Sequence, residues 1–148
     1  MTEASNVKQL ERSTFHLLKK AAQNAANLYV EKVGKNGITQ RQFAVLIAVN
    51  ENVGISQTKL VELTSIDRST LADLVGRLIA QGYLRRKRDK NDARRNVLKL
   101  SAAGKRALED AEPGLSSVDR KLSSLIPKEH RKSFRLALKI LADERQQS

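Results

Sequence analysis

Apolar residues recur at helical spacing through the first third of the chain. In residues 6–33 and 39–49 they return every three or four positions, which predicts two amphipathic helices. Thr39, with Gln42 three positions on, forms a capping-box pattern at the start of the second helix. Polar residues at 50–54 then predict a loop, after which Ile55 could add one residue to a small sheet.

The next segment predicts a pair of helices joined by a tight turn. Ser56 is a good N-cap for a short helix at 57–63, and Asp67 is one for a helix at 68–81. The second helix has an apolar stripe that we expect to face the core, formed by Leu71, Leu74, Val75, Leu78 and Ile79.

A strand pattern replaces the helical one after Gly82. Residues 83–87 and 96–100 predict two short strands, and the polar segment between them predicts a hairpin with a long basic tip. A further helix should run from Ser101 toward 125, with a kink or break at Pro113 and Gly114, before a last helix with Pro127 in its first turn. This order predicts a mainly α, winged helix-turn-helix fold in which the hairpin is the wing.

The charge of the chain concentrates on this hairpin. The 148 residues carry 28 basic and 16 acidic side chains, a formal net charge of +12. Residues 85–106 alone hold ten basic and two acidic side chains, so eight of the twelve net charges lie there. Like charges repel unless a polyanion neutralises them, which favours nucleic acid over an acidic membrane or a plain basic surface. The basic residues are Arg85, Arg86, Lys87, Arg88, Lys90, Arg94, Arg95, Lys99, Lys105 and Arg106.

Composition argues against several other classes. The chain has no cysteine, which excludes disulfides and thiolate metal sites. Its two histidines, His16 and His130, lie in no recognisable catalytic, metal or phosphate-loop motif, so we expect neither an enzyme nor a bound metal or cofactor. The longest apolar run, residues 43–49, is too short to cross a bilayer, and the first residues lack a signal-peptide core. We therefore expect a cytoplasmic protein without a membrane partner.

Two surfaces are candidates for contact with double-stranded DNA. The second helix of the pair would enter the major groove, with small residues such as Ala72 and Gly76 permitting close approach. An arginine at the hairpin tip could enter the minor groove, where the potential is most negative. An amphipathic helix with an ordinary solvated face is the alternative for the helix alone. The predicted DNA-binding residues are Arg68, Ser69, Thr70, Asp73, Arg77, Arg86, Arg88, Lys90, Asp92, Arg94 and Arg95.

Three segments carry a resemblance to the MarR family of bacterial regulators. Residues 91–104 resemble its wing, with an Asp-x-Arg tip, a strand ending in Leu-Ser and a glycine three residues later. Residues 69–78, followed by Gly-Tyr-Leu at 82–84, are similar to its recognition helix, and residues 38–46 to the opening of its second helix. The resemblance covers nearly the whole chain.

The resemblance implies one domain over residues 1–148 that works as a homodimer. Its DNA-binding lobe would span 38–100, and the helices at 6–33 and 101–145 would interlock with those of the partner. It also implies that Arg94 enters the minor groove, that Asp92 steadies it, and that Thr70 and Arg77 touch DNA. Two residues depart from the family pattern: Asp73 stands where many members have arginine, and Ser65 replaces a frequent glycine.

Many members of the family bind a small effector between the lobe and the dimer helices. His16, Lys20 and Asn24 form a polar stripe at i, i+4 spacing, and Arg41 lies near a helix N-terminus, which favours an anion. With Phe43 these are the predicted effector residues. Solvent exposure is the alternative for the stripe, and solvent or a phosphate contact for Arg41.

The middle of the chain resembles one branch of the family more closely. Residues 38–46, 56–61 and 66–75 are similar to the branch that controls aromatic-acid degradation, several members of which sense aromatic acyl-CoA thioesters. This implies a regulator of aromatic catabolism that binds a near-palindromic operator. An aromatic acyl-CoA or an aromatic carboxylate would release it from that operator.

Binding of nucleic acid without sequence preference is the alternative function. Basic charge alone would serve an architectural or RNA-binding protein without an effector, and such a protein would bind any duplex with similar affinity. A specific regulator requires a large gap between its operator and random DNA.

Overall fold

The protein is mainly helical, with one small hairpin, as the sequence predicts. A computed structural model describes residues 8–35, 37–92 and 94–143. The elements follow in the order α1 (Lys8–Arg12), α2 (Thr14–Val33), α3 (Gln40–Glu51), α4 (Gln57–Thr64), α5 (Arg68–Ala80), β1 (Leu84–Arg88), β2 (Asn96–Leu100), α6 (Ala102–Leu125), the 3-10 turn η1 (Lys128–His130) and α7 (Arg131–Asp143).

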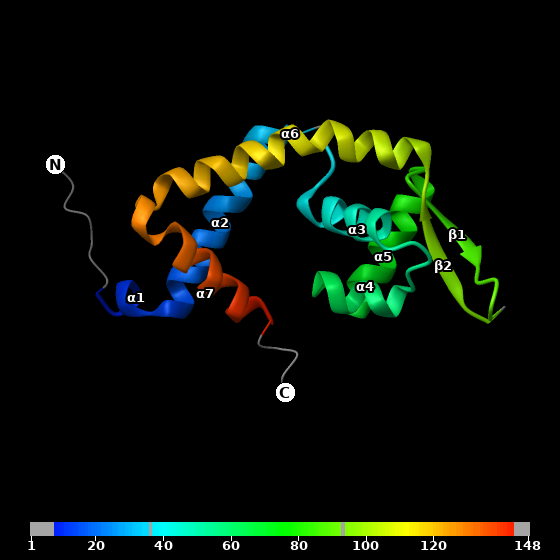
Figure 1. Cartoon of the computed structure of the whole chain (residues 1–148), viewed down its shortest axis with the longest axis horizontal. Coiled ribbons are helices and arrows are strands. Elements are labelled where there is room, and N and C mark those ends of the chain that lie inside the picture. The colour runs from blue at the N-terminus through cyan, green and yellow to red at the C-terminus, as the bar shows by residue number, and fades with distance from the viewer. Residues whose placement is uncertain (1–7, 36, 93, 144–148) are drawn as a thin grey trace.

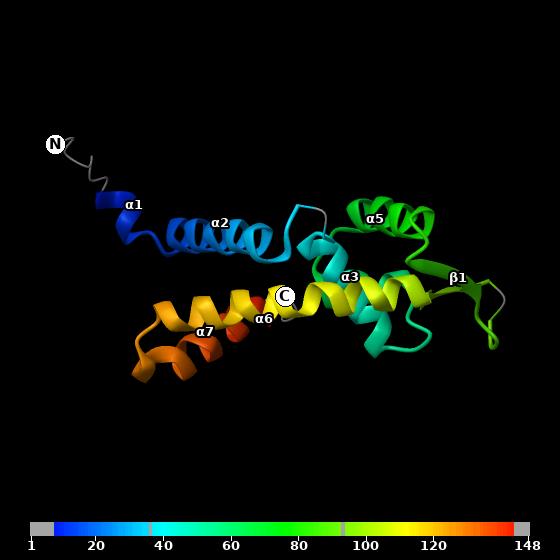
Figure 2. The same cartoon turned by 90° about the horizontal axis from the view of Figure 1, so that it is seen from above.

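The long helix α6 links two groups of elements (Figure 1). On one side α3, α4, α5 and the hairpin form a lobe, and α1, α2 and α7 are on the other side (Figure 1). From above, α2 runs beside α6 (Figure 2). Gly114 makes this crossing close, because an added Cβ there would lie 2.8 Å from Val33 Cγ2 and 3.0 Å from the Lys32 carbonyl.

The core lies in the lobe. Buried leucines and valines come from the inner face of each lobe helix, from both strands and from the first half of α6. The stripe predicted for α5 is confirmed, since Leu71, Val75 and Leu78 are fully buried and Leu74 and Ile79 pack at the edge of the core. Tyr29 of α2 ties the outer helices to the lobe, because its buried hydroxyl donates a 2.8 Å hydrogen bond to the Ile38 carbonyl, and burial raises the pKa of that phenol.

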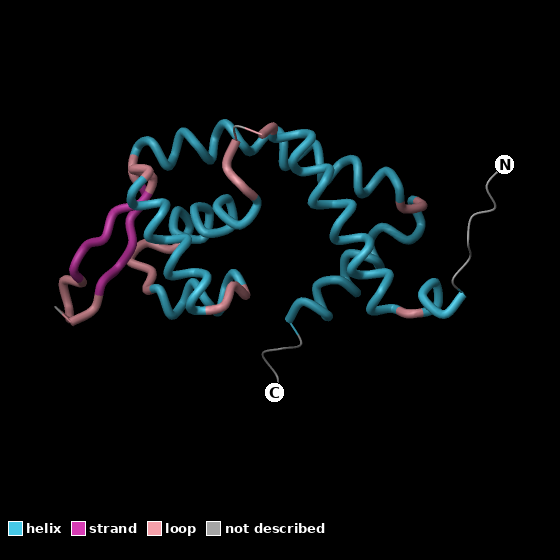
Figure 3. The backbone as a smooth tube through the Cα atoms, turned by 180° about the vertical axis from the view of Figure 1, so that it is seen from behind, coloured by secondary structure: helices cyan, strands magenta, loops and turns pink. Residues whose placement is uncertain are grey.

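The hairpin is a two-stranded antiparallel sheet (Figure 3). Leu84 pairs with Leu100, Arg86 with Leu98 and Arg88 with Asn96. Beyond the two strands, the amide of Leu98 donates to the Ile55 carbonyl at 3.1 Å. The residue that forms the isolated bridge to this sheet is Ser56, one position after the residue that the sequence predicts.

The sequence predicts one continuous helix over residues 6–33, and this prediction is wrong because the structure has two helices there. Ser13 separates α1 from α2, and its side chain accepts the amide of His16 at 3.2 Å, so a serine hydroxyl starts a new helix within an apolar-periodic stretch. Residues 6 and 7 of the predicted helix lie outside the described residues. Gly34 ends α2 with a φ of 91°, a conformation that glycine adopts without strain.

Three other predicted features differ from the structure. The helix α6 runs unbroken through Pro113, which is exposed, so water can hydrate the carbonyl that proline leaves without a donor. Pro127 lies just before the 3-10 turn rather than in the first turn of α7. The predicted loop at 50–54 begins later, because α3 extends to Glu51. Within the described ranges no helix has the length and apolar content needed to cross a membrane.

Candidate nucleic-acid interface

Helix α5 begins at a tight turn that aims its first residues outward. Ser65 adopts the left-handed conformation at φ 57°, which lets the chain reverse between α4 and α5. Asp67 then caps α5, accepting the Thr70 amide at 2.9 Å and the Thr70 hydroxyl at 2.6 Å. Arg68 and Ser69 are exposed in this first turn, and Thr70 is half-buried because its hydroxyl turns back to the cap.

The cap carries a perturbed carboxylate. The hydroxyl of Thr70 lowers the pKa of Asp67, and the Thr70 amide and the positive charge of Arg41 lower it further. Arg41, in the first turn of α3, is therefore near a carboxylate of the chain itself. This electrostatic attraction offers a second explanation for Arg41 beside the predicted effector contact.

Two predicted DNA-binding residues are paired with each other on α5. Asp73 Oδ2 lies 3.1 Å from Arg77 Nη2, and both side chains are largely exposed. The two residues are one helical turn apart, on the face of α5 opposite the buried stripe. The side chain of Arg77 is thus oriented by a carboxylate.

The basic side chains of the first hairpin strand are exposed to solvent. Arg85, Arg86, Lys87 and Arg88 of β1 are all exposed. At the tip, Asp92 Oδ1 accepts the Arg94 amide at 3.0 Å, and the Asp92 carbonyl accepts the Arg95 amide at 3.0 Å. These bonds fix the backbone at Arg94, while the predicted role of its side chain stays a prediction.

The hairpin is fastened to the lobe at its base. The hydroxyl of Ser101 donates to the Gly82 carbonyl and accepts the Gly104 amide at 3.0 Å, so one side chain joins the end of α5 to the start of α6. Gly104 has no room for a side chain, since an added Cβ would collide with the Tyr83 carbonyl and lie 2.7 Å from Leu100 Cδ1. The Leu-Ser pair and the later glycine of the wing pattern thus have a packing role.

A pocket that the sequence analysis missed lies between α4 and the hairpin. It has a volume of about 540 Å³ and is lined by the first turn of α4, by Glu62, whose carboxylate pairs with Lys59, and by Arg94, Arg95 and Asn96. Ser56 accepts the Lys59 amide, which leaves the amides of Gln57 and Thr58 outside the helix ladder. Helix N-termini favour anions, and the Ser56 cap with Lys59 in the first turn was the available signal.

The predicted effector residues do not form one cluster within the chain. His16, Lys20 and Asn24 lie along the N-terminal half of α2, with His16 half-buried and the other two exposed. Arg41 is exposed at the start of α3, and Phe43 packs against the edge of the core. Their assignment to an effector stays a prediction.

A pocket does lie between the lobe and the last helix, with a different lining. It has a volume of about 650 Å³ and is formed by the end of α4, by the turn that leads to Asp67 and by Ala142 of α7. None of the five predicted effector residues is among the residues that line it.

The outer helices expose large apolar side chains. Phe15 of α2 is 72% exposed, and no residue of α7 is buried. The exposed apolar residues of these elements are Leu10, Phe15, Leu17, Leu18, Val30, Phe134, Leu136, Leu138, Ile140 and Leu141. A surface of this kind usually marks an interface.

Known proteins share this architecture. The sequence profile of the MarR family matches residues 36–95. The Escherichia coli transcriptional regulator HosA is 30% identical over 125 residues, which cover 84% of this chain and 91% of HosA.

Two solved structures extend the comparison. The Streptomyces coelicolor transcriptional regulator PcaV, solved in complex with its natural ligand, has 27% identity and a TM-score of 0.83, covering 95% of this chain and 97% of its own. The transcriptional repressor CouR, bound to a 23-mer DNA duplex, shares the fold at 23% identity and a TM-score of 0.86, covering 95% and 99%.

The family match, the relative and the winged helix-turn-helix architecture agree with the resemblance seen in the sequence. MarR-family proteins act by binding DNA and are not enzymes, which confirms the prediction of a non-enzymatic protein. This chain belongs to the MarR family of DNA-binding transcriptional regulators.

Proposed function

We propose that the protein is a dimeric, sequence-specific repressor that reads a near-palindromic operator. The observation that carries this proposal is the arrangement within one lobe of an exposed α5 face, the N-terminus of α4 and a hairpin whose β1 cations are all exposed. Helix α5 enters the major groove, and the residues expected to contact DNA there are Arg68, Ser69, Thr70, Asp73 and Arg77.

The hairpin follows the backbone on either side of α5. Arg94 enters the minor groove, and the neighbouring cations contact phosphates. The α4 pocket holds one phosphate between the Gln57 and Thr58 amides and Arg95. Phosphate contacts fix the register of the protein on the duplex, while α5 contributes the sequence information.

Dimerisation covers the apolar surface of the outer helices. In a monomer, the large apolar side chains that α1, α2 and α7 expose would meet water, and apolar surface of this kind usually marks an interface. A two-fold partner covers the same patch on both chains and places two α5 helices on successive major grooves. The half-sites should therefore lie about ten base pairs apart.

Selection of binding sites from random duplexes, followed by footprinting, tests the DNA-binding proposal. The expected product is one near-palindromic motif protected over both half-sites. Recovery of no motif, with equal protection of every duplex, would favour the alternative of a sequence-blind architectural or RNA-binding protein.

An anionic aromatic effector releases the repressor from its operator. PcaV was solved with its natural ligand, and CouR was also solved bound to p-coumaroyl-CoA, so the fold accommodates small effectors. In this chain the basic charge can meet the carboxylate of an aromatic acid or the phosphates of an aromatic acyl-CoA. The predicted contacts are His16, Lys20, Asn24, Arg41 and Phe43, brought together across the dimer, and the regulated genes would serve aromatic catabolism.

Release requires that the effector bind one dimer geometry better than the other. A ligand between the lobe and the dimer helices would favour a spacing of the α5 pair that no longer fits two half-sites. A hundredfold loss of operator affinity corresponds to a coupling of about 2.7 kcal/mol.

Calorimetric titration with aromatic acids, their CoA thioesters and free CoA tests the effector. Binding by thioesters with release from the operator is the expected result, and binding by free acids alone would reassign the effector to a simple carboxylate. Release by free CoA as effective as release by thioesters would show that the aromatic group is not recognised. Binding by none of them would refute this effector class.

A further inference from the structure

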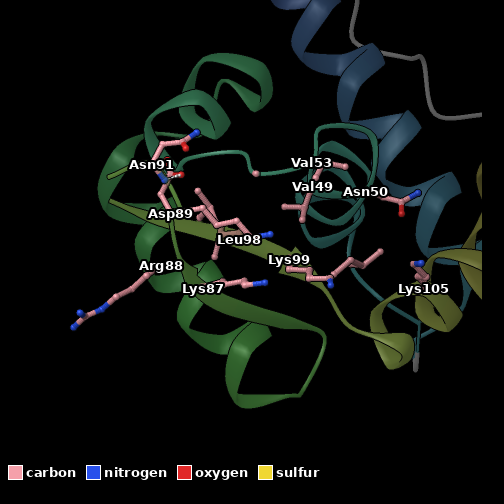
Figure 4. A pocket seen from close by; sticks show the side chains of 14 residues that line it. Val49, Asn50, Val53, Lys87, Arg88, Asp89, Asn91, Leu98, Lys99 and Lys105 are labelled. Atoms are coloured by element: carbon pink, nitrogen blue, oxygen red, sulfur yellow. Dashed lines mark hydrogen bonds between the residues drawn. The ribbon is translucent and has the colours of Figure 1, made fainter. Parts of the chain in front are cut away.

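A third pocket lies between the DNA-binding lobe and the start of α6. It has a volume of about 480 Å³ and is bounded by the end of α3, the loop after it, the hairpin and the first turn of α6 (Figure 4). All its lining residues fall between Val49 and Lys105, so one chain completes it without a partner. Its size is within the range of small-molecule sites.

The floor of this pocket is apolar. Val49 reaches it from the last turns of α3, and Val97 from β2. Val53, at the tip of the loop, is 100% exposed and makes no contribution to the core. A ligand that covers these side chains removes apolar area from water, at about 25 cal/mol per Å².

The wall of the pocket is cationic. Lys87 is opposite Val97 in the register, and Lys99 is two residues from Val97, so all three side chains leave the same face of the hairpin. Figure 4 shows Lys87 and Lys99 on one side of the strands, with Lys105 beyond them on α6. Among the described residues none of these three lysines takes part in an ion pair.

One acidic residue, Asp89, lines the pocket. It accepts the amide of Asn91 at 3.0 Å, which holds its carboxylate at the hairpin turn. The cations that line the pocket outnumber this single carboxylate and repel one another, so an anion placed among them lowers the free energy of the lobe.

We propose that this pocket is a ligand site for a small amphipathic anion, a carboxylate or phosphate ester that carries an apolar ring or short chain. The apolar part covers Val53 and Val97, and the anionic group lies among Lys87, Lys99 and Lys105. This site differs from the effector cleft proposed above, since each lobe binds one ligand independently of dimerisation.

A ligand bound in the pocket lowers the affinity of the hairpin for DNA. Arg88 and Lys90, both predicted DNA-binding residues, also line the pocket. Figure 4 shows the Arg88 side chain directed away from the pocket, where it can reach a phosphate. A bound anion within the Debye length of these cations, about 8 Å at physiological salt, offsets part of the charge that DNA would otherwise neutralise.

Calorimetry without DNA tests the site with 4-phenylbutyrate and phenyl phosphate as probes. Two controls separate the contributions of charge and apolar area: 4-phenylbutanol lacks the charge, and inorganic phosphate lacks the apolar part. Both probes should bind about tenfold more tightly than either control. Binding of inorganic phosphate equal to that of phenyl phosphate would reduce the site to a phosphate contact of the DNA interface and overturn the proposal, as would no binding of either probe at millimolar concentration.

Two single substitutions locate the site. Val53→Asp and Lys105→Gln should each weaken 4-phenylbutyrate binding about tenfold. Lys121→Gln is the matched control, because it removes an exposed lysine from the far half of the same helix. Equal weakening by all three substitutions, in proteins with unchanged thermal unfolding, would contradict the assignment. Retained binding in Arg41→Ala keeps the result separate from the proposed effector cleft, and the absence of DNA keeps it separate from operator recognition.

Discussion

The carboxylate of Asp73 lies 3.1 Å from the guanidinium of Arg77, one turn apart on the exposed face of α5. An exposed pair of this kind adds little to stability, roughly 0.3–0.5 kcal/mol, so its main effect is on what the helix presents to DNA. The acid orients the arginine and repels phosphates that approach off register. The Asp73–Arg77 pair thus favours a base-reading role for Arg77 over a general phosphate contact.

Asp73→Ala should raise affinity for random duplexes and lower the ratio of operator to random affinity. The substitution frees Arg77 to bind any phosphate and removes a repulsive charge from the groove face. Shift assays with selected and scrambled duplexes measure both affinities. Glu109→Ala removes an equal charge from an exposed position on α6 and should leave the ratio unchanged. An unchanged ratio in Asp73→Ala would contradict the reading role.

Thr70→Val should raise the pKa of Asp67 back toward 3.8, because the Thr70 hydroxyl is the main cause of its lowering. A lowered pKa in the folded state means that the ionised cap stabilises the fold above pH 3.8 and that this contribution is lost as the pH falls through the folded-state pKa. Carboxyl-carbon NMR titration follows Asp67 directly. Ser69→Ala is the control, and equal shifts in both variants would show that the hydroxyl is not the cause.

Gly104→Ala should destabilise the fold by about 1–3 kcal/mol, since the added methyl meets the Tyr83 carbonyl and Leu100. Gly76→Ala, in α5, should instead stabilise the fold. No atom lies within 4 Å of a Cβ at Gly76, and alanine should stabilise α5 by about 0.5–1 kcal/mol. Thermal unfolding at matched concentration compares the two, and a Gly104→Ala protein as stable as wild type would contradict the close packing at the hairpin base.

Removal of residues 128–148 should give monomers or aggregates, because α7 supplies much of the exposed apolar surface. The single substitution Phe134→Glu tests the same surface without removing α7. Sedimentation across a concentration series should show a weakened dimer for Phe134→Glu and an unchanged one for Lys139→Glu, a charge reversal at a polar position of α7. Clean dimers in both truncated and Phe134→Glu proteins would place the interface elsewhere.

Local signals in the sequence predict many element boundaries in this chain. The hydroxyl of Thr39, the carboxylate of Asp67 and the hydroxyl of Ser101 each cap the helix that the sequence predicts, because a side-chain cap depends on neighbours three residues away. The buried stripe of α5 follows from spacing alone.

The features that the sequence does not predict depend on packing or solvent. Ser13 resembles other helix-interior serines, and only the structure shows that it caps a new helix. Pro113 reads as a break, but exposure of the helix at that position makes it tolerable. The α4 pocket joins residues almost forty positions apart, from Gln57 to Arg94, so the Ser56 cap could indicate the helix N-terminus but not the arginines that lie across from it. In our proposal the candidate effector residues likewise come together only across the dimer.

Operator discrimination tests the central account most directly. The dissociation constants of the wild-type protein are measured for the selected near-palindromic duplex and for a scrambled duplex of equal length, at about 150 mM salt. Base reading by α5 predicts a ratio of roughly a thousandfold or more, with Arg94→Ala weakening operator binding by about 1–3 kcal/mol. Equal affinity for the two duplexes would contradict sequence-specific regulation by this protein.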